Sequence, residues 1–234
     1  MFILKYETRY GDYKNFDEIK PSSVLDMIQD VSTKDSARCG YDMIRLKEMN
    51  LAWLLQGVNV KFEKPVKTHI PVELSTAVKT LKGATSARGC YIRQNGEVVA
   101  KSIANWFLFD TAKQRIGRVS QDMISAYEFC EFEDDFFEYK KAPVLEIEEP
   151  GYKIKIANKE IDTNGHLNNQ KGAELLMDAL PFDFDFNSMK LLYKKQAYLG
   201  DELEVCRKEI PDGYYVHMVN AVGDVCVAGT FEKV

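Results

Sequence analysis

The stretch V-N-V-K-F-E-K-P-V-K-T-H-I-P-V-E-L (residues 58–74) is echoed later in the chain by K-L-L-Y-K-K-Q-A-Y-L-G-D-E-L (residues 190–203). Each copy reads as an apolar strand, a polar turn and the start of another strand. A sequence that repeats itself within one chain indicates that a structural unit has been duplicated. We therefore expect two copies of one unit, and the elements around each copy support this.

The first half predicts a strand, a helix and then four strands. The helix starts at Pro21, carries apolar residues near helical spacing through about Arg38, and is ended by Gly40. The expected strands are residues 2–10, 51–62, 72–81, 86–93 and 98–109. Asn95 and Gly96 predict a tight hairpin turn between the last two strands, because both residues tolerate positive φ.

The second half repeats this order after an acidic, aromatic stretch and two prolines. It predicts a strand at residues 151–158 and a helix from Asn168 or Asn169 to Leu180, which Pro181 stops. Four strands follow, at residues 188–196, 202–209, 214–221 and 225–231. We predict an N-terminal unit at residues 1–135, a linker at 136–150 and a C-terminal unit at 151–234.

The fold class that this order predicts is α+β. In each unit a helix would pack on its own antiparallel sheet, and a sheet of that size leaves edge strands exposed. Pairing the two units edge to edge would cover those edges and form a pseudo-dimer. Such pairing would also create a cleft between unlike halves, which is a favoured place for a ligand.

Composition limits the functions that the chain can have. It has 234 residues, of which 45% are hydrophobic, and a net charge of -5. That charge argues against a general nucleic-acid binder. The five cysteines contain no C-x-x-C pair and indicate neither a zinc site nor a disulfide framework. No apolar run approaches the roughly 20 residues of a membrane span, and the start is too soon charged for a signal peptide, so we expect a cytoplasmic protein without membrane insertion.

The polar stretch D-T-N-G-H-L-N-N (residues 162–169) lies between the strand and the helix of the second unit. One reading is an ordinary solvated turn. If residues 162–166 are extended, however, Asp162, Asn164 and His166 lie on one side of the chain. The helix that follows would present unpaired N–H groups, which suit a carbonyl oxygen that gains charge. A carboxylate that orients water beside such donors describes acyl hydrolysis.

Other chemistries fit this stretch less well. In a calcium loop that starts at Asp162, the sixth position would be Leu167 in place of Gly, and the twelfth would be Ala173 in place of Glu. A covalent mechanism is the minor alternative, because there is no G-x-S-x-G elbow and no cysteine lies near His166 in the sequence. We expect no metal and no cofactor.

A strand, D-x-N-G-H-x-N-N and a helix within a duplicated unit resemble the fatty acyl–acyl carrier protein (acyl-ACP) thioesterases, here of the bacterial type, which are double hotdog proteins. Further matching stretches are Y-E-T-R-Y near the start, L-A-W-L-L, V-K-F-E-K-P, A-N-W-F-L-F-D and L-L-Y-K-K-Q-A-Y-L-G-D-E-L. The resemblance implies two tandem hotdog units, each a long helix packed on an antiparallel sheet. It also implies hydrolysis of the thioester between a fatty acyl chain and acyl carrier protein, which releases free fatty acid and ends chain elongation.

The resemblance places Asp162, Asn164 and His166 at catalytic positions. It implies that Asp162 orients or activates water, that Asn164 positions the carboxylate or the thioester, and that His166 assists by hydrogen bonding or proton transfer. The equivalent loop of the first unit, G-D-Y-K-N-F-D-E-I-K (residues 11–20), lacks the Asn-Gly-His series. The first unit of such proteins mainly shapes the acyl pocket, so we expect one active centre per chain.

Three departures from the family pattern stand out. Gln196 occupies the fourth catalytic position, where the family commonly has a Glu, and an amide cannot serve as a base. Ala197 stands where a cysteine is sometimes present beside that Glu. Gly172 and Leu175 replace the aromatic residues that usually follow the motif.

Asn168, Asn169 and Trp53 are the residues that we assign to substrate binding. Acyl carrier protein is the expected partner, and a homodimer is compatible with exposed sheet edges. Three alternatives stay open: a thioesterase that acts on acyl-coenzyme A, a non-catalytic acyl-binding hotdog protein, and a scaffold whose polar loop is fortuitous.

Overall fold

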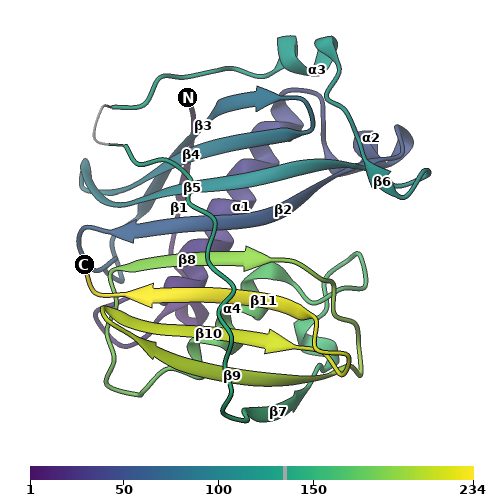
Figure 1. Ribbon diagram of the computed structural model, residues 1–234. Coiled ribbons are helices and arrows are strands. Elements are labelled where there is room, and N and C mark those ends of the chain that lie inside the picture. The colour runs from purple at the N-terminus through teal and green to yellow at the C-terminus, as the bar shows by residue number, and fades with distance from the viewer. Residues whose placement is uncertain (134–135) are drawn as a thin grey trace. The chain divides into compact units, whose positions relative to one another are not determined.

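The computed structural model describes residues 1–133 and 136–234, and the chain divides into two compact units, Met1–Tyr139 and Lys140–Val234 (Figure 1). The boundary predicted at residue 135 lies outside the described residues. Each unit contains a helix and an antiparallel sheet, as the sequence predicts. Within the described residues, no helix is both long enough and apolar enough to span a bilayer.

The first unit is built on a five-stranded antiparallel sheet with the order β1-β3-β4-β5-β2. A two-residue strand, β6, pairs with β5. The bounds are β1 (Phe2–Tyr6), β2 (Leu51–Phe62), β3 (Val72–Lys82), β4 (Thr85–Gln94), β5 (Glu97–Asp110) and β6 (Arg115–Ile116). The hairpin between β4 and β5 turns at Asn95 and Gly96, whose φ angles are 51° and 82°, which confirms the predicted turn.

Helix α1 (Pro21–Arg38) packs against β3 and β1 and lies behind the strands of its unit in Figure 1. It begins at Pro21, because proline is favoured in the first turn, where its missing N–H has no partner to lose. The apolar stripe predicted from the sequence is buried as far as Val31, with Leu25 and Val31 at zero exposure, but Ala37 at its end is exposed. The helix and its start are therefore confirmed.

A buried ion pair fastens α1 to the sheet. Arg88 on β4 donates to Asp35 on α1 across 2.5 Å, and the two side chains are only 6% and 2% exposed. Arg38 also donates to Asp35, at 2.9 Å. The buried carboxylate is thus neutralised by two guanidinium groups, which is the arrangement that makes a buried charge tolerable.

Several short elements escaped the sequence analysis. They are α2 (Met43–Glu48), α3 (Gln121–Ala126), and the 3-10 helices η1 (Tyr10–Asp12) and η2 (Asn158–Glu160). Asp42 and Ser120 cap α2 and α3 by accepting from backbone N–H groups three residues later. These elements are shorter than two turns of α-helix, so apolar periodicity has too few residues in which to appear.

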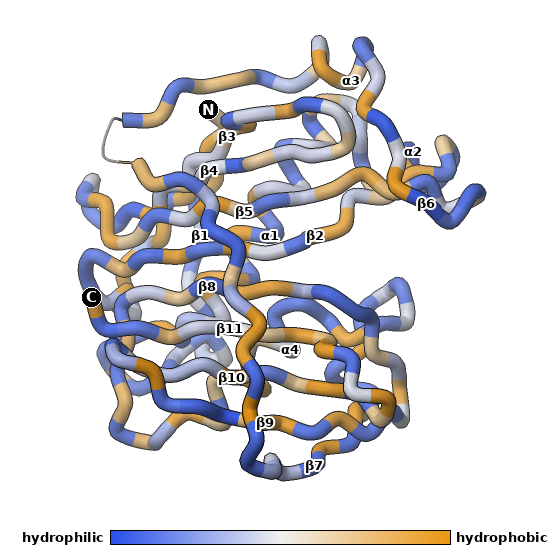
Figure 2. The backbone as a smooth tube through the Cα atoms, in the orientation of Figure 1, coloured by the Kyte–Doolittle hydropathy of each residue, from blue (hydrophilic) through white to orange (hydrophobic). Residues whose placement is uncertain are grey.

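The second unit has the strand order β8-β11-β10-β9-β7, again antiparallel. Its strands are β7 (Tyr152–Lys155), β8 (Ser188–Tyr193), β9 (Glu202–Ile210), β10 (Gly213–Val219) and β11 (Val225–Glu232). Helix α4 (Asn169–Met177) packs on β11 and β10. Hydrophobic residues recur along these strands in Figure 2, as expected of a sheet with one face in the core.

Three elements of the second unit end three residues before their predicted ends. Strand β7 ends at Lys155 and not at residue 158, because η2 begins at Asn158. Strand β8 ends at Tyr193 and not at residue 196, because the N–H groups of Lys194 and Lys195 both turn to the carbonyl of Cys226. Helix α4 ends at Met177 and not at Leu180, since the Ala179 N–H bonds to Leu176 in a tighter turn.

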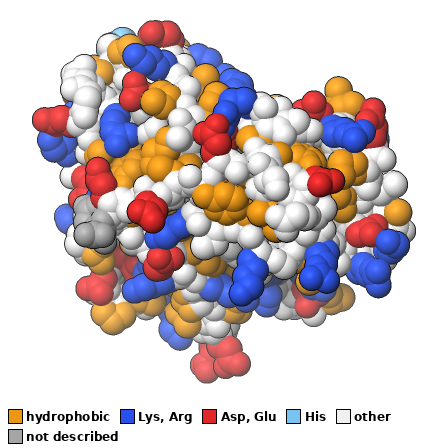
Figure 3. Space-filling view, turned by 90° about the horizontal axis from the view of Figure 1, so that it is seen from above, with side chains coloured by type: hydrophobic (Ala, Val, Ile, Leu, Met, Phe, Trp, Pro, Cys, Tyr) orange, Lys and Arg blue, Asp and Glu red, His pale blue; other side chains and the backbone are white. Residues whose placement is uncertain are grey.

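Charge is mixed over the face of the molecule seen in Figure 3. Lysine and arginine side chains alternate there with aspartate and glutamate, and hydrophobic side chains lie between them. That face carries no single basic field of the kind that holds a nucleic-acid backbone.

The five cysteines are free thiols, and Cys90, Cys206 and Cys226 are buried.

Replacing Asp35 by Ala is expected to lower the free energy of unfolding by about 3 kcal/mol, because it leaves Arg88 charged and buried without its partner. The midpoint of a urea titration measures this. Glu97→Gln is the control, since Glu97 makes an exposed ion pair with Lys64, and it should leave the midpoint unchanged. Equal midpoints for both variants would contradict a fastening role for the buried pair.

Candidate active site

The 162–166 loop is a closed turn. The Asp162 N–H donates to the His166 carbonyl at 2.8 Å, and the Gly165 N–H donates back to the Asp162 carbonyl at 3.1 Å. Gly165 has a φ of 80°, a conformation that glycine adopts without steric cost. The chain is therefore not extended here, so alternation along a strand does not place these side chains on one side. Asp162, Asn164 and His166 are brought together by folding of the loop and not by alternation along a strand.

The two carboxylate oxygens of Asp162 have different surroundings. Oδ1 accepts from the backbone N–H groups of Asn164, at 2.8 Å, and His166, at 3.2 Å. Oδ2 has a single long contact, 3.4 Å from the Asn164 amide nitrogen. Because ordinary N–H···O bonds measure about 2.7–3.2 Å, Oδ1 holds the loop and Oδ2 is left to accept a further hydrogen bond. The side chain is half-buried, so water reaches it.

The loop is fixed to the rest of its unit at the residues that follow it. The Leu167 N–H donates to the Ala197 carbonyl, and the Asn168 N–H donates to the Glu160 carbonyl, both at 2.8 Å. Glu160 is only 8% exposed. Its carboxylate accepts from the Ala157 N–H at 2.7 Å and so closes η2. The end of the loop is therefore held from two directions.

The start of α4 is capped by a side chain of the motif. Asn168 Oδ1 accepts from the N–H groups of Gln170, at 2.8 Å, and Lys171, at 3.2 Å. The expectation that these N–H groups are unpaired and face a substrate is therefore wrong, because the cap has taken them. The helix therefore begins at Asn169, with Asn168 as its cap. Asn169 instead presents its carbonyl to the Tyr193 hydroxyl at 3.0 Å, and burial raises the Tyr193 pKa.

Gln196 lies in the turn after β8 and is exposed. Its Oε1 accepts from the Tyr198 hydroxyl at 3.1 Å. The Tyr198 ring in turn contacts the His166 ring edge to face, with 5.1 Å between centroids. Tyr198 was not among the residues predicted from the sequence, where only its position two residues after Gln196 could have pointed to it. The contact with His166 depends on chain pairing that no local pattern predicts.

Trp53 belongs to the first unit, where it lies on β2 and packs at the side of a buried apolar cluster. The buried members of that cluster are Leu46, Val78, Leu81, Leu108, Val119, Met123 and Tyr127. Trp53 therefore covers one side of this cluster in the core of the first unit. Its assignment to substrate binding stays a prediction.

The first unit repeats the backbone of the loop with different side chains. Three backbone hydrogen bonds, each from an N–H group to a carbonyl, recur in both units. The bond that closes the loop runs from Lys14 to Glu18 (2.7 Å) in the first unit and from Asp162 to His166 (2.8 Å) in the second. The two bonds that hold its end run from Ile19 to Val66 and from Lys20 to Asp12 in the first unit, and from Leu167 to Ala197 and from Asn168 to Glu160 in the second, all at 2.8 Å. Two isolated bridges also correspond: Glu18 with Lys67, and His166 with Tyr198. The two loops are the same structure in duplicate.

The chemistry of the first-unit loop is nevertheless different. Glu18 stands where the second unit has His166, and it pairs with Lys14 at 3.9 Å and Lys67 at 3.6 Å. Lys14 stands in the place of Asp162. In this loop the Glu18 carboxylate is paired with two lysines. The 162–169 loop instead holds a carboxylate, amides and an imidazole. The arrangement supports one chemically equipped loop per chain.

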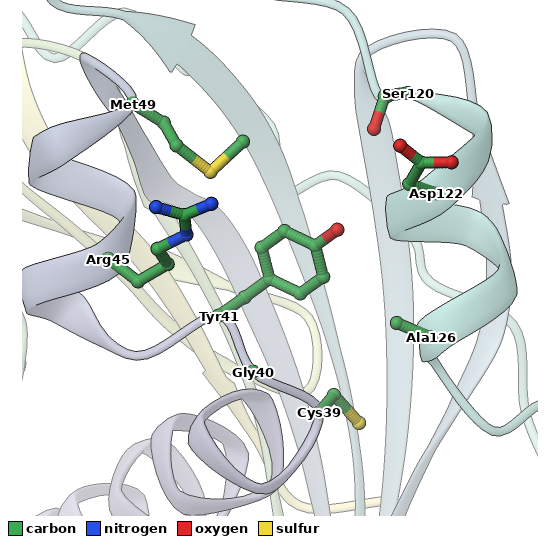
Figure 4. Close-up of a pocket in the computed structure, with 8 residues that line it drawn as sticks. All are labelled: Cys39, Gly40, Tyr41, Arg45, Met49, Ser120, Asp122 and Ala126. Atoms are coloured by element: carbon green, nitrogen blue, oxygen red, sulfur yellow. The ribbon is translucent and has the colours of Figure 1, made fainter.

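Two cavities lie elsewhere in the units. One, of about 280 Å³, opens beside the C-terminal end of α1, where Tyr41 lies between Arg45 on α2 and Asp122 at the start of α3 (Figure 4). The other, of about 170 Å³, is in the second unit and is lined by Glu160, Lys171 and Glu174 among others. Neither is lined by Asp162, Asn164, His166 or Gln196. Among the described residues, no group of three or more His, Cys, Asp or Glu could hold a metal ion.

Solved structures similar to this chain share its fold along nearly the whole length. A structure of an acyl-ACP thioesterase from Bacteroides thetaiotaomicron VPI-5482 has a TM-score of 0.91 at 14% identity, covering 99% of this chain and 96% of that one. A 12:0-ACP thioesterase from Umbellularia californica has a TM-score of 0.85 at 15% identity, with coverages of 99% and 96%.

A shorter structure corresponds to about half of the chain. A hypothetical protein from Aquifex aeolicus has a TM-score of 0.51 at 12% identity, and 55% of this chain covers 100% of it. No curated protein matches the sequence. Two family models do: the acyl-ACP thioesterase N-terminal domain matches residues 1–127 and the acyl-ACP thioesterase C-terminal domain matches residues 143–229. The chain therefore belongs to the acyl-ACP thioesterase family and is a thioester hydrolase of the double hotdog type.

Proposed function

We propose that this protein hydrolyses the thioester of fatty acyl–acyl carrier protein at the 162–169 loop, with Asp162 as the group that orients and deprotonates water. The observation that carries the proposal is the unequal use of the Asp162 oxygens. Oδ1 is occupied by two backbone N–H groups, and Oδ2 has only a long contact with Asn164. A water molecule that donates to Oδ2 would be held by a carboxylate whose orientation is already fixed.

The reaction follows from these positions. Water loses a proton to Asp162 Oδ2 while its oxygen attacks the carbonyl carbon of the thioester. The carbonyl oxygen gains negative charge, and the side-chain N–H groups of Asn164 and His166 are the donors assigned to stabilise it. The carbon–sulfur bond then breaks, the carbonyl double bond reforms, and the proton returns to the departing sulfur. The products are a free fatty acid and the thiol of the carrier.

The imidazole of His166 suits the donor role in this scheme. Among the described residues its ring nitrogens have no hydrogen-bond partner, while its ring is held by Tyr198. Asn164 is exposed and keeps one amide N–H beyond its long contact with Asp162. Both groups can therefore turn their donors to a substrate without breaking a bond that the fold requires.

Asp162→Asn is expected to lower kcat by about 10²–10⁴-fold, the range for loss of a general base. The amide oxygen can still accept from the Asn164 and His166 N–H groups, so the loop and the unfolding midpoint should be unchanged. Asp162→Ala should lose activity equally and also about 1 kcal/mol of stability, because those two bonds are lost. Fatty acid release and urea titration measure the two effects. If Asp162→Asn keeps the native kcat, Asp162 is not the base and serves only to hold the loop.

The proposed partner is acyl carrier protein in the cytoplasm. We expect a higher kcat/KM on acyl-ACP than on acyl-coenzyme A with the same acyl chain, measured as free acid released from each carrier loaded with that one chain. Equal or reversed values would favour the acyl-coenzyme A thioesterase. Stoichiometric acyl binding without release would favour the non-catalytic alternative. A homodimer is a further prediction, which sedimentation of the whole chain would test.

A further inference from the structure

Tyr198 has a backbone that is held on both sides. It forms an isolated antiparallel bridge with His166, next to the hydrogen bond from Leu167 to Ala197. Its N–H donates to Asp201 Oδ2 at 2.8 Å, and its carbonyl accepts from the Asp201 N–H at 3.1 Å. Residues opposite one another in antiparallel pairing have their side chains side by side. The fold thus delivers the Tyr198 side chain to His166.

The Tyr198 side chain remains half in water. Its exposure is 49%, so core packing does not account for an aromatic residue at this position. Its ring meets the His166 ring at an interplanar angle of 69°, with the centroids 5.1 Å apart. This is the edge-to-face geometry that aromatic pairs prefer. The contact restricts the orientation of the imidazole, which otherwise has no hydrogen-bond partner for its nitrogens among the described residues.

The Tyr198 hydroxyl acts on a second side chain. It donates to Gln196 Oε1 at 3.1 Å. A primary amide has one acceptor oxygen and an NH2 group with two donors. Because the oxygen is engaged by the hydroxyl, the NH2 group of Gln196 is left to donate. An ionised carboxylate at this position could only accept, so Gln196 gives the site a group of the opposite hydrogen-bonding character.

The first unit provides an internal comparison for this contact. Its equivalent bridge joins Glu18 to Lys67, and their side chains form an ion pair at 3.6 Å. The same backbone pairing therefore accommodates an ion pair in one unit and an aromatic contact in the other. The fold requires the bridge, but it does not require a tyrosine or a histidine.

We propose that Tyr198 is a positioning residue of the active site: its ring orients the imidazole of His166, and its hydroxyl orients the Gln196 amide so that the NH2 group donates to the thioester carbonyl oxygen. The proposal rests on the proposed function, because it takes the 162–169 loop as the place of hydrolysis. Gln196 then serves as a third donor to the oxyanion. Because position 196 holds an amide and not a carboxylate, the proposal keeps Asp162 as the base.

The ring contact is tested without any reference to hydrolysis. The chain has 3 histidines, so the His166 ring proton signals can be assigned by NMR with a His166→Gln variant. Tyr198→Phe should keep their ring-current shift, and Tyr198→Leu should remove it. Tyr152, which is also 49% exposed and belongs to the same unit, supplies the control: Tyr152→Leu should leave the signals in place. Unchanged signals in Tyr198→Leu would overturn the ring contact.

The hydroxyl contact is tested by kinetics on acyl-ACP. Tyr198→Phe should lower kcat about tenfold with little change in KM, the size expected from one hydrogen bond of ordinary strength. In a Gln196→Met background the same substitution should have no further effect, because the hydroxyl acts through the amide. Tyr152→Phe should match the native rate. Independent, multiplying effects of the two substitutions would overturn the proposed link.

The substitution Gln196→Glu tests whether residue 196 acts as a hydrogen-bond donor or as a base. If the amide donates to the oxyanion, the carboxylate should lower kcat, whereas a rise in kcat would overturn the donor role. A native chain that releases no fatty acid, while the NMR result holds, would refute the proposed function and leave the His166 contact established.

Discussion

Two backbone hydrogen bonds support the arrangement of the site. They run from Leu167 to Ala197 and from Asn168 to Glu160, and they fix the end of the loop just where α4 begins. Because the same two bonds recur in the first unit, from Ile19 to Val66 and from Lys20 to Asp12, they belong to the fold and not to the chemistry. A polar loop at the surface would otherwise have many conformations, and ordering it would cost backbone entropy at each residue. The duplicated frame supplies that order before any substrate binds.

Within this frame, the mechanism that we propose gives Asp162 two roles, which are divided between its oxygens. Oδ1 closes the loop by accepting from two backbone N–H groups, and Oδ2 is available to water. A substitution by alanine removes both roles at once, so its effect on rate mixes loss of a base with loss of loop structure. Asparagine keeps the acceptor and removes the charge. The pair of variants therefore separates structure from chemistry at a single position.

The two loops differ in charge, and this difference is the reason why we assign hydrolysis to the second loop alone. In the first unit, Lys14 and Lys67 surround Glu18, and these groups compensate one another. In the second unit, the bridge partners are His166 and Tyr198, which are in contact through their rings and leave the polar atoms of the imidazole for another molecule. Gln196, which stands where the family commonly has a Glu, also leaves the second loop without a further negative charge. An amide can stabilise a developing negative charge that a second carboxylate would oppose.

The sequence by itself determined the duplication, the strands, the start of α1 at Pro21 and the Asn95-Gly96 turn, because apolar periodicity and turn chemistry act over a few neighbouring residues. It also identified Asp162, Asn164 and His166 as a group, through residue types and a family resemblance. Only the tertiary structure decided how they converge: in a closed turn and not an extended chain, with Asn168 already used as a cap. Tyr198 and Glu160 became visible only there as well. Their partners lie far along the chain or depend on backbone pairing, and contacts of that kind are set by the packing of the whole unit and not by any local pattern.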